Sequence, residues 1–232
     1  GGESTAETLA EVGIPREHVR VIVGGAPGEY VANSSGTWSQ KASFPMIVML
    51  TRLEPYKRVD LAIRALSFLR KELPKVKLFV VGWGKLEVML KELARSLGLH
   101  DCVVFTGPLF GKSKFDILTK AHVHMWSLAP RDGCGLSIME AFACGTPSVA
   151  WNVPGPKDTI QHGKTGFLLP YADIRALADA LRVILTDDSL RRRLSTEARL
   201  WASMHTWEHV AAEFIRHVEE TTFRWNQRAR RS

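Results

Sequence analysis

The chain of 232 residues is 45% hydrophobic and carries a formal net charge of +7. This length allows one large domain or two small ones. No apolar run approaches the ~20 residues of a membrane-spanning helix, and the first residues lack the basic and apolar regions of a signal peptide. We therefore expect a soluble protein of the cytoplasm.

Three cysteines, Cys102, Cys134 and Cys144, stand at unrelated spacings. They form neither a metal-ligand pair nor an even set for disulfides, and such usage suits a reducing compartment. The sequence therefore predicts no structural metal, and it offers no motif for a bound cofactor.

Part of the positive charge lies in the last residues, because Arg224, Arg228, Arg230 and Arg231 follow the final acidic residue. Such a run is typical of solvated surface. The alternative is peripheral contact with an anionic membrane at its cytoplasmic face. We expect no nucleic-acid partner, because aromatic and basic residues alternate only over residues 223–225.

The first 43 residues contain little that predicts an independent core. A helical stretch is expected from Thr8 to Val12 and a strand over Val19–Val23. Residues 26–43 are rich in Gly, Ser, Ala and Asn and lack periodicity, which is typical of a linker or mobile loop. A lone helix and strand cannot bury a core, so this part is either the end of another domain or a segment that packs on the main one.

From Met46 onward, apolar segments of strand length alternate with amphipathic helical segments. The run Met46–Leu50 is continuous, as expected for a strand covered on both faces. The pattern predicts an α/β fold with a doubly wound, Rossmann-like parallel sheet, followed after Pro170 by helices alone. The expected strands are residues 46–50, 78–81, 103–105, 123–127, 148–151 and 167–169, and the expected helices are 59–69, 86–97, 113–120, 174–185, one after 188, and 207–218.

In such sheets ligands bind at the carboxyl ends of the strands, so residues that follow strands are the first candidates for a site. The segment 51–57 follows the first strand and carries Arg52 and Lys57. An arginine offers a planar fork to phosphate oxygens and a lysine a point charge, so the pair could hold a diphosphate. The alternative is that both are ordinary cations of a solvated surface.

The loop and helix after the fourth strand form the second candidate site. Gly133 and Gly135 let the backbone approach a ligand closely, and the free N–H groups of the first helical turn favour an anion. Asp132 and Glu140 bracket this segment. Glu140 has a second interpretation, since Ser137-Ile-Met-Glu140 fits a capping box in which the glutamate closes back on the cap residue.

Other motifs carry less information. Gly82-Trp-Gly-Lys85 lacks the third glycine of a dinucleotide loop and follows the second strand, which disfavours a nicotinamide or flavin enzyme. Gly111-Lys-Ser113 is better explained as a helix start than as a phosphate cradle. His122 and His124 lie on one face of the fourth strand without a third ligand, so we expect them to be structural.

Taken in order, these elements resemble the C-terminal, donor-binding domain of a retaining GT-B glycosyltransferase of family 4. The resemblance covers Met46 to about Phe214. Each motif is loose, but the ordered set is specific. The motifs are Thr51-Arg-Leu-Glu-Pro-Tyr-Lys57, Val81-Gly-Trp-Gly84, Phe105-Thr-Gly107, Asp132-Gly-Cys-Gly-Leu with Glu140-Ala-Phe-Ala-Cys-Gly-Thr-Pro-Ser-Val-Ala150, His162-Gly-Lys-Thr-Gly-Phe-Leu-Leu-Pro170 and Trp207-Glu208.

The resemblance implies transfer of a hexose from a nucleotide diphosphate sugar, of the GDP-mannose or UDP-glucose type, to a glycan or lipid-linked acceptor. It also implies retention of the anomeric configuration without a metal. Arg52 and Lys57 would hold the diphosphate, and Glu140 the ribose hydroxyls. The implied catalytic residues are Asp132, Arg52 and Lys57, and the implied nucleotide-sugar-binding residues are Arg52, Lys57, Gly82, Gly107, Leu109, Asp132, Gly133, Cys134, Gly135, Leu136 and Glu140.

The sequence departs from the family pattern in the glycine loop, where Asp132 replaces the usual glutamate and Cys134 an aromatic residue. Family members carry an acceptor-binding domain before the linker. The expected organisation is therefore 1–43 as the remnant of that domain plus linker, 44–205 as the nucleotide-sugar domain, and 206–232 as a C-terminal helix with a basic tail. Two alternatives remain: a GT-B epimerase, and a non-catalytic nucleotide-sugar-binding module that acts with a partner chain.

Overall fold

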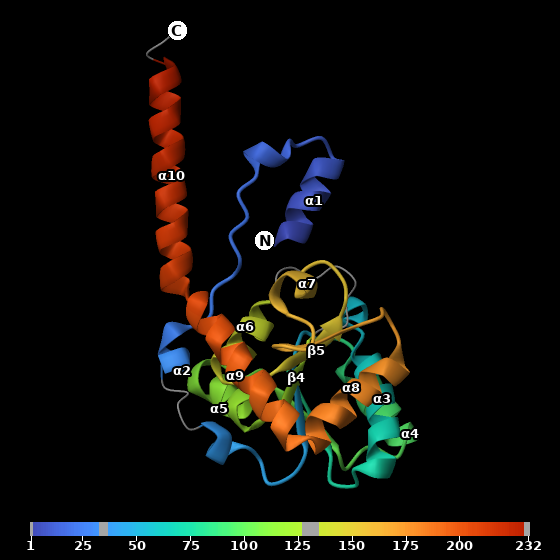
Figure 1. Ribbon diagram of the computed structural model, residues 1–232. Coiled ribbons are helices and arrows are strands. Elements are labelled where there is room, and N and C mark those ends of the chain that lie inside the picture. The colour runs from blue at the N-terminus through green and yellow to red at the C-terminus, as the bar shows by residue number, and fades with distance from the viewer. Residues whose placement is uncertain (1, 33–36, 127–134, 230–232) are drawn as a thin grey trace.

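The described part of the chain, residues 2–32, 37–126 and 135–229 of the computed structural model, is built around a parallel six-stranded sheet (Figure 1). Every pair of neighbouring strands in it runs parallel. This confirms the predicted doubly wound, Rossmann-like fold. In spatial order the strands are β3 (Val103–Gly107), β2 (Lys77–Val81), β1 (Met46–Leu50), β4 (Val123–Met125), β5 (Ser148–Trp151) and β6 (Gly166–Leu169).

Strand β1 lies in the middle of the sheet and is covered on both faces. Its side chains alternate between two hydrophobic clusters, with Ile47 and Met49 in the larger cluster and Met46 and Val48 in the smaller. Successive side chains of a strand point to opposite faces, so an apolar residue is needed at every position. The continuous apolar run in the sequence follows from this burial.

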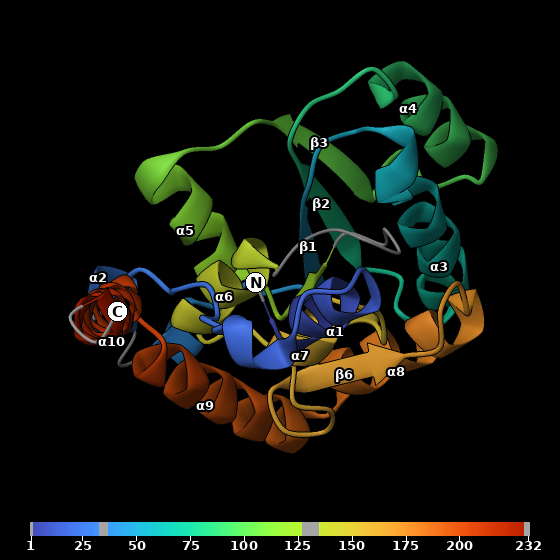
Figure 2. The same cartoon turned by 90° about the horizontal axis from the view of Figure 1, so that it is seen from above.

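Helices cover the two faces of the sheet in separate groups. Figure 2 shows α3 and α4 on one side of the strands and α5 and α6 on the other. Helix α8 packs beside α3, and α9 packs against both α6 and α8. The bounds are α3 (Val59–Glu72), α4 (Glu87–Ser96), α5 (Gly111–Lys120), α6 (Leu136–Ala143), α8 (Ile174–Thr186) and α9 (Asp188–Met204).

The predicted linker, residues 26–43, is partly folded onto the domain. It contains the short helix α2 (Gly28–Ala32) and a 3₁₀ turn, η2 (Thr37–Gln40). The Tyr30 ring stacks on Phe115 of α5 with ring centroids 3.5 Å apart. The short helix was not predicted, because a single aromatic contact that anchors it leaves no periodic signal in the sequence, and the assignment of residues 26–43 to a linker stays a prediction.

The predicted strand Val19–Val23 does not form. The structure gives this segment no strand and places its residues at the surface or half-buried, between η1 (Arg16–His18) and α2. Alternating valines favour an extended chain, but a strand also needs a neighbour for its backbone hydrogen bonds. Nearby, Ala26 forms only an isolated bridge with Thr206.

Helix α1 (Glu3–Glu11) packs on the short helix α7 (Pro156–Thr159). The backbone N–H and the hydroxyl of Ser4 both donate to the Asp158 carboxylate, and the Ser4 hydroxyl accepts from the backbone N–H of Gly155. Lys157 and Glu7 form an ion pair at 3.0 Å. The first residues thus lie against the main domain, above the carboxyl ends of the strands (Figure 1).

The last helix, α10 (Trp207–Ala229), projects away from the domain on the same side as α1 (Figure 1). The side chains of Phe214, Ile215 and Val218 are exposed along it. Over the described residues, no helix is both long and apolar enough to cross a membrane. Of the basic tail, residues 230–232 and the side chains of Arg224 and Arg228 lie outside the described part.

Candidate functional site

Among the described site residues, Arg52 and Lys57 follow β1, and Glu140 lies on α6, the helix between β4 and β5. The order of the sheet reverses between β1 and β4. These two strands are paired in parallel, with Ile47 opposite Val123 and Val48 opposite His124. The chain after β1 enters α3 on one face and the chain before β5 enters α6 on the other (Figure 2). In open α/β sheets, the crevice at such a reversal is the usual ligand site.

Backbone hydrogen bonds connect the loop after β2 to the loop after β1 and to the last residue of β3. The Gly82 N–H donates to the Gly107 carbonyl at 3.0 Å, and the Leu53 N–H to the Trp83 carbonyl at 2.9 Å. A Cβ added to Gly82 would lie 1.8 Å from the Thr51 carbonyl oxygen, at a φ of +144°. Only glycine fits there. In this structure Gly82 and Gly107 are joined by their backbone hydrogen bond. Their role in nucleotide-sugar binding stays a prediction.

Arg52 and Lys57 meet at one aromatic ring. The Arg52 guanidinium donates to the Tyr56 hydroxyl, and the Lys57 ammonium lies 4.9 Å from the centroid of the same ring. Arg52 is exposed, whereas Lys57 is only 8% exposed. A tyrosine between two cations limits their rotamers through cation–π contact. The predicted pair is therefore held close together by a residue that the sequence analysis did not single out.

The backbone between Lys57 and α3 takes an unusual conformation. Arg58 lies in the left-handed region with a φ of +51°, which costs a non-glycine residue on the order of 1 kcal/mol. Its guanidinium forms two hydrogen bonds of 3.0 Å with the Asp60 carboxylate. The bidentate ion pair, which raises the pKa of Arg58, fixes this turn and with it the path of Lys57.

Helix α6 begins directly after the predicted glycine loop. Gly135 caps it in the left-handed conformation with a φ of +68°, and a Cβ there would lie 2.6 Å from Cδ1 of Ile138. Leu136 is the first helical residue and is partly exposed. The first N–H groups of any helix lack partners within the helix and favour an anion. Three predicted site residues, Asp132, Gly133 and Cys134, lie outside the described part of the chain.

Glu140 forms an ion pair with a lysine on another helix. The Lys114 ammonium of α5 lies 2.6 Å from Oε1 of Glu140, and the two side chains are 24% and 22% exposed. The capping-box interpretation of Glu140 is wrong, because α6 begins at Leu136 with Gly135 as its cap. Ser137 is already inside the helix, so Glu140 lies too far along it to close back on a cap.

The remaining predicted contact, Leu109, is half-buried and packs against the smaller hydrophobic cluster. Its neighbour Phe110, which precedes α5, is 75% exposed. Leu109 stays a predicted base contact, and the structure places it in the loop that follows β3.

Two charged or aromatic residues of this region, Tyr56 and Lys114, were not predicted from the sequence. Tyr56 stands within the segment that was singled out for Arg52 and Lys57. For Lys114 there was a weaker signal, because a lysine in the first turn of a helix is unfavourable to the helix dipole. Such a residue needs a partner elsewhere.

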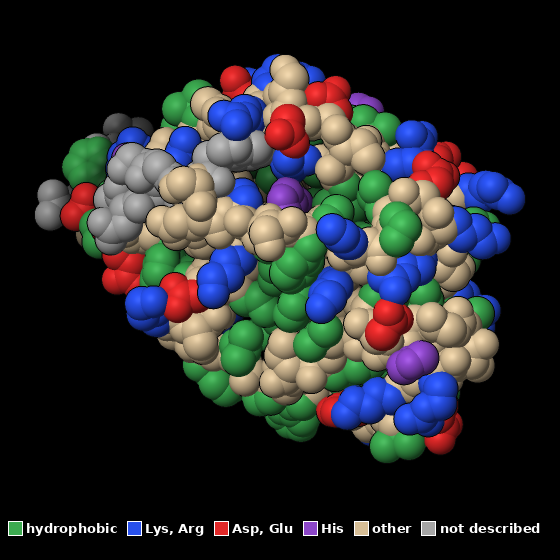
Figure 3. Space-filling model, turned by 90° about the horizontal axis from the view of Figure 1, so that it is seen from below, with side chains coloured by type: hydrophobic (Ala, Val, Ile, Leu, Met, Phe, Trp, Pro, Cys, Tyr) green, Lys and Arg blue, Asp and Glu red, His purple; other side chains and the backbone are tan. Residues whose placement is uncertain are grey.

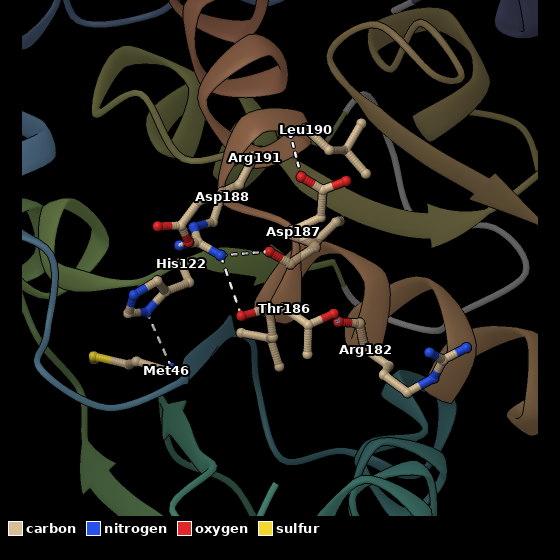
Figure 4. Close-up of polar contacts among 10 residues, drawn as sticks. Met46, His122, Arg182, Thr186, Asp187, Asp188, Leu190 and Arg191 are labelled. Carbon is tan, nitrogen blue, oxygen red and sulfur yellow. Dashed lines mark hydrogen bonds and ion pairs between the residues drawn. The ribbon is translucent and has the colours of Figure 1, made fainter. Parts of the chain in front are cut away.

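A second polar cluster lies at the amino end of the sheet, where helices end. The Arg191 guanidinium of α9 donates to the carbonyl oxygens of Ile184 and Leu185 in the last turn of α8, at 2.7 and 3.2 Å (Figure 4). The Lys41 ammonium donates to the Ala121 carbonyl at 2.6 Å and to the Thr146 hydroxyl at 2.9 Å. Burial lowers the pKa of Lys41 to about 7.

His122 and His124 belong to this cluster and have structural contacts, as expected. Nδ1 of His122 accepts the Met46 N–H at 3.1 Å (Figure 4), and Nδ1 of His124 lies 3.0 Å from the Ser148 hydroxyl. Burial lowers the pKa of His122 to about 4, with Arg191 nearby adding to the effect, and lowers that of His124 to about 3. Both imidazoles are therefore neutral near pH 7.

The outer surface at this end of the molecule carries mixed charge. Figure 3 shows basic side chains spread around the rim, with acidic ones among them and hydrophobic side chains toward the middle. Among the residues that the structure describes, no group of three or more His, Cys, Asp or Glu side chains is placed to hold a metal ion. The cations Arg191 and Lys41 at the amino end donate to carbonyls of the protein itself, so the carboxyl end of the sheet is the candidate site.

Known proteins match this chain in sequence and in fold. A profile of the family described as Glycosyl transferases group 1 matches residues 35–201. An exopolysaccharide phosphotransferase of Streptomyces coelicolor is 34% identical over 179 residues, which are 73% of this chain and 19% of that protein. The GDP-mannose-dependent alpha-(1-6)-phosphatidylinositol monomannoside mannosyltransferase of Mycolicibacterium smegmatis is 32% identical over 170 residues, 71% of this chain and 44% of that enzyme.

Among solved structures, Anabaena HepE in complex with UDP superposes with a TM-score of 0.82 at 19% identity. The match covers 94% of this chain and 62% of that one, and it concerns the GT-B glycosyltransferase fold. The chain spans less than half the length of the two curated relatives above. Since the family profile matches well over half of its residues, the chain belongs to the glycosyl transferases group 1 family.

Proposed function

We propose that this chain is the C-terminal, donor-binding part of a retaining GT-B glycosyltransferase of family 4. It binds a nucleotide diphosphate sugar and passes the hexose to a glycan or lipid-linked acceptor. The observation that supports the proposal is that Arg52 and Lys57 follow β1, and α6 with Glu140 lies between β4 and β5, on the two sides of the reversal point of the sheet. The acceptor is bound by a further domain that pairs with this one.

The proposed chemistry follows from where negative charge develops. When the bond between the sugar and the diphosphate breaks, charge accumulates on the departing phosphate oxygen. Preorganised positive groups stabilise that charge more than they stabilise the ground state. Arg52, Lys57 and the N–H groups that begin α6 supply this stabilisation, and Asp132 contacts the sugar hydroxyls. Retention requires the acceptor to attack on the face from which the diphosphate leaves.

The mannosyltransferase relative favours GDP as the nucleotide, because its name gives GDP-mannose as the donor and it is 32% identical to this chain. Support for UDP rests on a fold match at 19% identity and is weaker. We therefore expect the guanine series to bind best, with the base beside Leu109 and the ribose beside Glu140.

Calorimetric titration of the chain with GDP, UDP and ADP tests the proposal. We expect one base series to bind, and Lys57→Met to weaken that binding roughly 10- to 100-fold, the effect of losing one charge-assisted hydrogen bond. Lys85→Met is the matched control. Lys85 lies on the neighbouring loop, is 67% exposed and pairs with Glu54 at 3.1 Å.

Two results would contradict the proposal. One is a folded chain that binds none of the three nucleotides. The other is an equal loss of affinity in the Lys57 and Lys85 variants, which would reduce the effect to general charge. Circular dichroism of each variant distinguishes loss of the site from loss of the fold.

A further inference from the structure

We propose that Lys114 is a positioning residue, which orients the Glu140 carboxylate so that the site recognises ribose. The inference rests on the proposed function. It starts from the ion pair between Lys114 of α5 and Glu140 of α6, whose charged atoms are 2.6 Å apart. The two residues are 26 positions apart in the chain, so the pair joins two helices.

Glu140 is the one acidic residue of α6, an otherwise largely apolar helix. Its neighbours Met139 and Ala141 are fully buried, and its own side chain is only 22% exposed. A carboxylate in such a place loses much of its hydration, which is costly unless a partner compensates. The Lys114 ammonium supplies that compensation.

Lys114 gains little from its own helix. It lies in the first turn of α5, where the positive end of the helix dipole disfavours a cation. Its ammonium also lies 4.9 Å from the centroid of the Phe115 ring, which in turn stacks on Tyr30. The lysine therefore contacts one ring of a packed aromatic pair, and its favourable charge partner is on α6.

In the proposed arrangement, each oxygen of the Glu140 carboxylate has a different partner. In the described part of the chain, the hydrogen bond to Glu140 comes from Lys114 and goes to Oε1. The two hydroxyls of a ribose are donors side by side, and Oε2 can accept from them. An ionised carboxylate has about four acceptor sites on its two oxygens. Lys114 thus fixes the rotamer of Glu140 and offsets its repulsion of the nucleotide phosphates.

The test compares ribose with deoxyribose. The nucleoside diphosphate that binds best, together with its 2′-deoxy counterpart, is titrated into the wild-type chain and into Lys114→Met. We expect Lys114→Met to weaken binding of the ribonucleotide about 10-fold and to weaken the deoxynucleotide less. The ratio of the two affinities then falls several-fold. A purely structural role would leave this ratio unchanged.

Lys112→Met is the matched control, because Lys112 lies on the same helix, is 82% exposed and pairs with Asp116 one turn later. It should leave both affinities unchanged. Lys114→Arg keeps the charge and should retain most of the ribose preference, and Lys114→Gln serves as the second charge-removing variant if Lys114→Met does not fold.

The inference is overturned if the wild-type chain binds nucleotide and Lys114→Met keeps its ribose-to-deoxyribose ratio. It is also overturned if Lys112→Met lowers the ratio as much as Lys114→Met does. A wild-type chain that binds no nucleotide removes the proposed function and this inference together. The two failures can therefore be told apart.

Discussion

The cations at the two ends of the sheet lie at opposite ends of helices. At the amino end, Arg191 and Lys41 donate to backbone carbonyls where α8 and α5 end. At the carboxyl end, Arg52 and Lys57 lie in the segment that leads into α3. A helix carries partial negative charge at its C-terminus and partial positive charge at its N-terminus. Cations therefore offset the helix dipoles at the amino end and add to them at the carboxyl end.

This difference separates a structural role from a functional one among side chains of the same kind. At the amino end, the carbonyls of the protein itself satisfy the cations, and Arg191 is only 5% exposed. At the carboxyl end, Arg52 is exposed and donates to the neutral Tyr56 hydroxyl, while Glu54 of the same segment pairs with Lys85. A positive potential built in this way favours an anionic ligand such as a diphosphate.

The largest expected effect breaks the amino-end cluster. Arg191→Met should lower the free energy of unfolding by about 2–4 kcal/mol, because the carbonyls of Ile184 and Leu185 lose a buried donor. Urea denaturation followed by circular dichroism measures it. Nucleotide affinity should not change, since this cluster lies at the other end of the sheet from the candidate site.

Arg193→Met is the control for that experiment. Arg193 is on the same helix and also donates to a carbonyl, that of Gly163 at 2.9 Å, but its side chain is exposed. We expect a change below about 1 kcal/mol. Equal losses in the two variants would show that burial does not distinguish the amino-end cations.

The second effect depends on pH. In the folded chain the pKa of His122 is lowered to about 4 from an ordinary value of 6.5. Between these values the unfolded chain binds a proton that the folded chain does not. The contribution of neutral His122 to stability is therefore fully present above pH 6.5 and is lost as the pH falls toward 4. Each such histidine contributes a slope of up to about 1.4 kcal/mol per pH unit.

The pH dependence can be assigned by comparing wild type with His122→Gln. Between about pH 6.5 and 4.5, the slope of the unfolding free energy against pH should be smaller in the variant. The difference should reach up to about 1.4 kcal/mol per pH unit, which corresponds to one proton. His124 and the carboxylates contribute equally to both proteins and cancel. An unchanged slope would mean that His122 takes up its proton in the folded state, in spite of Arg191 and Lys41 beside it.

The fold was largely predictable from the sequence, because burial on both faces of a sheet dictates long apolar runs. The strand bounds Met46–Leu50 and Ser148–Trp151 agree with the structure. The extended segment Val19–Val23 shows the limit of this reasoning, since alternation is local and strand pairing is not. The helix α2 escaped for the same reason: its stacking partner Phe115 is far away in the chain.

The candidate site was predictable where its residues follow strands and unpredictable where they meet across helices. Arg52 and Lys57 were found because they come directly after β1. The ion pair between Lys114 and Glu140 was not, since no pattern within α5 or α6 specifies which of their charged residues face each other. The same holds for Lys41, which the sequence places in an apparent linker and the structure places against the ends of α5 and α6.

The smallest expected effect separates the two ends by their response to salt. Raising the ionic strength from 0.1 M to 1 M shortens the Debye length from about 10 Å to about 3 Å, and buried pairs are screened much less than exposed ones. The loss of stability in Arg191→Met relative to wild type should therefore change by less than about 1 kcal/mol between the two salt conditions. Taking this difference cancels the general effect of salt on folding.

Nucleotide affinity should behave in the opposite way. The dissociation constant of the nucleotide that binds best should rise several-fold over the same range, because exposed Arg52 supplies part of the attraction. The advantage of wild type over Lys57→Met should shrink less, since Lys57 is only 8% exposed. If affinity is insensitive to salt while the Arg191→Met loss disappears at 1 M, the assignment of structural and ligand-attracting cations is reversed.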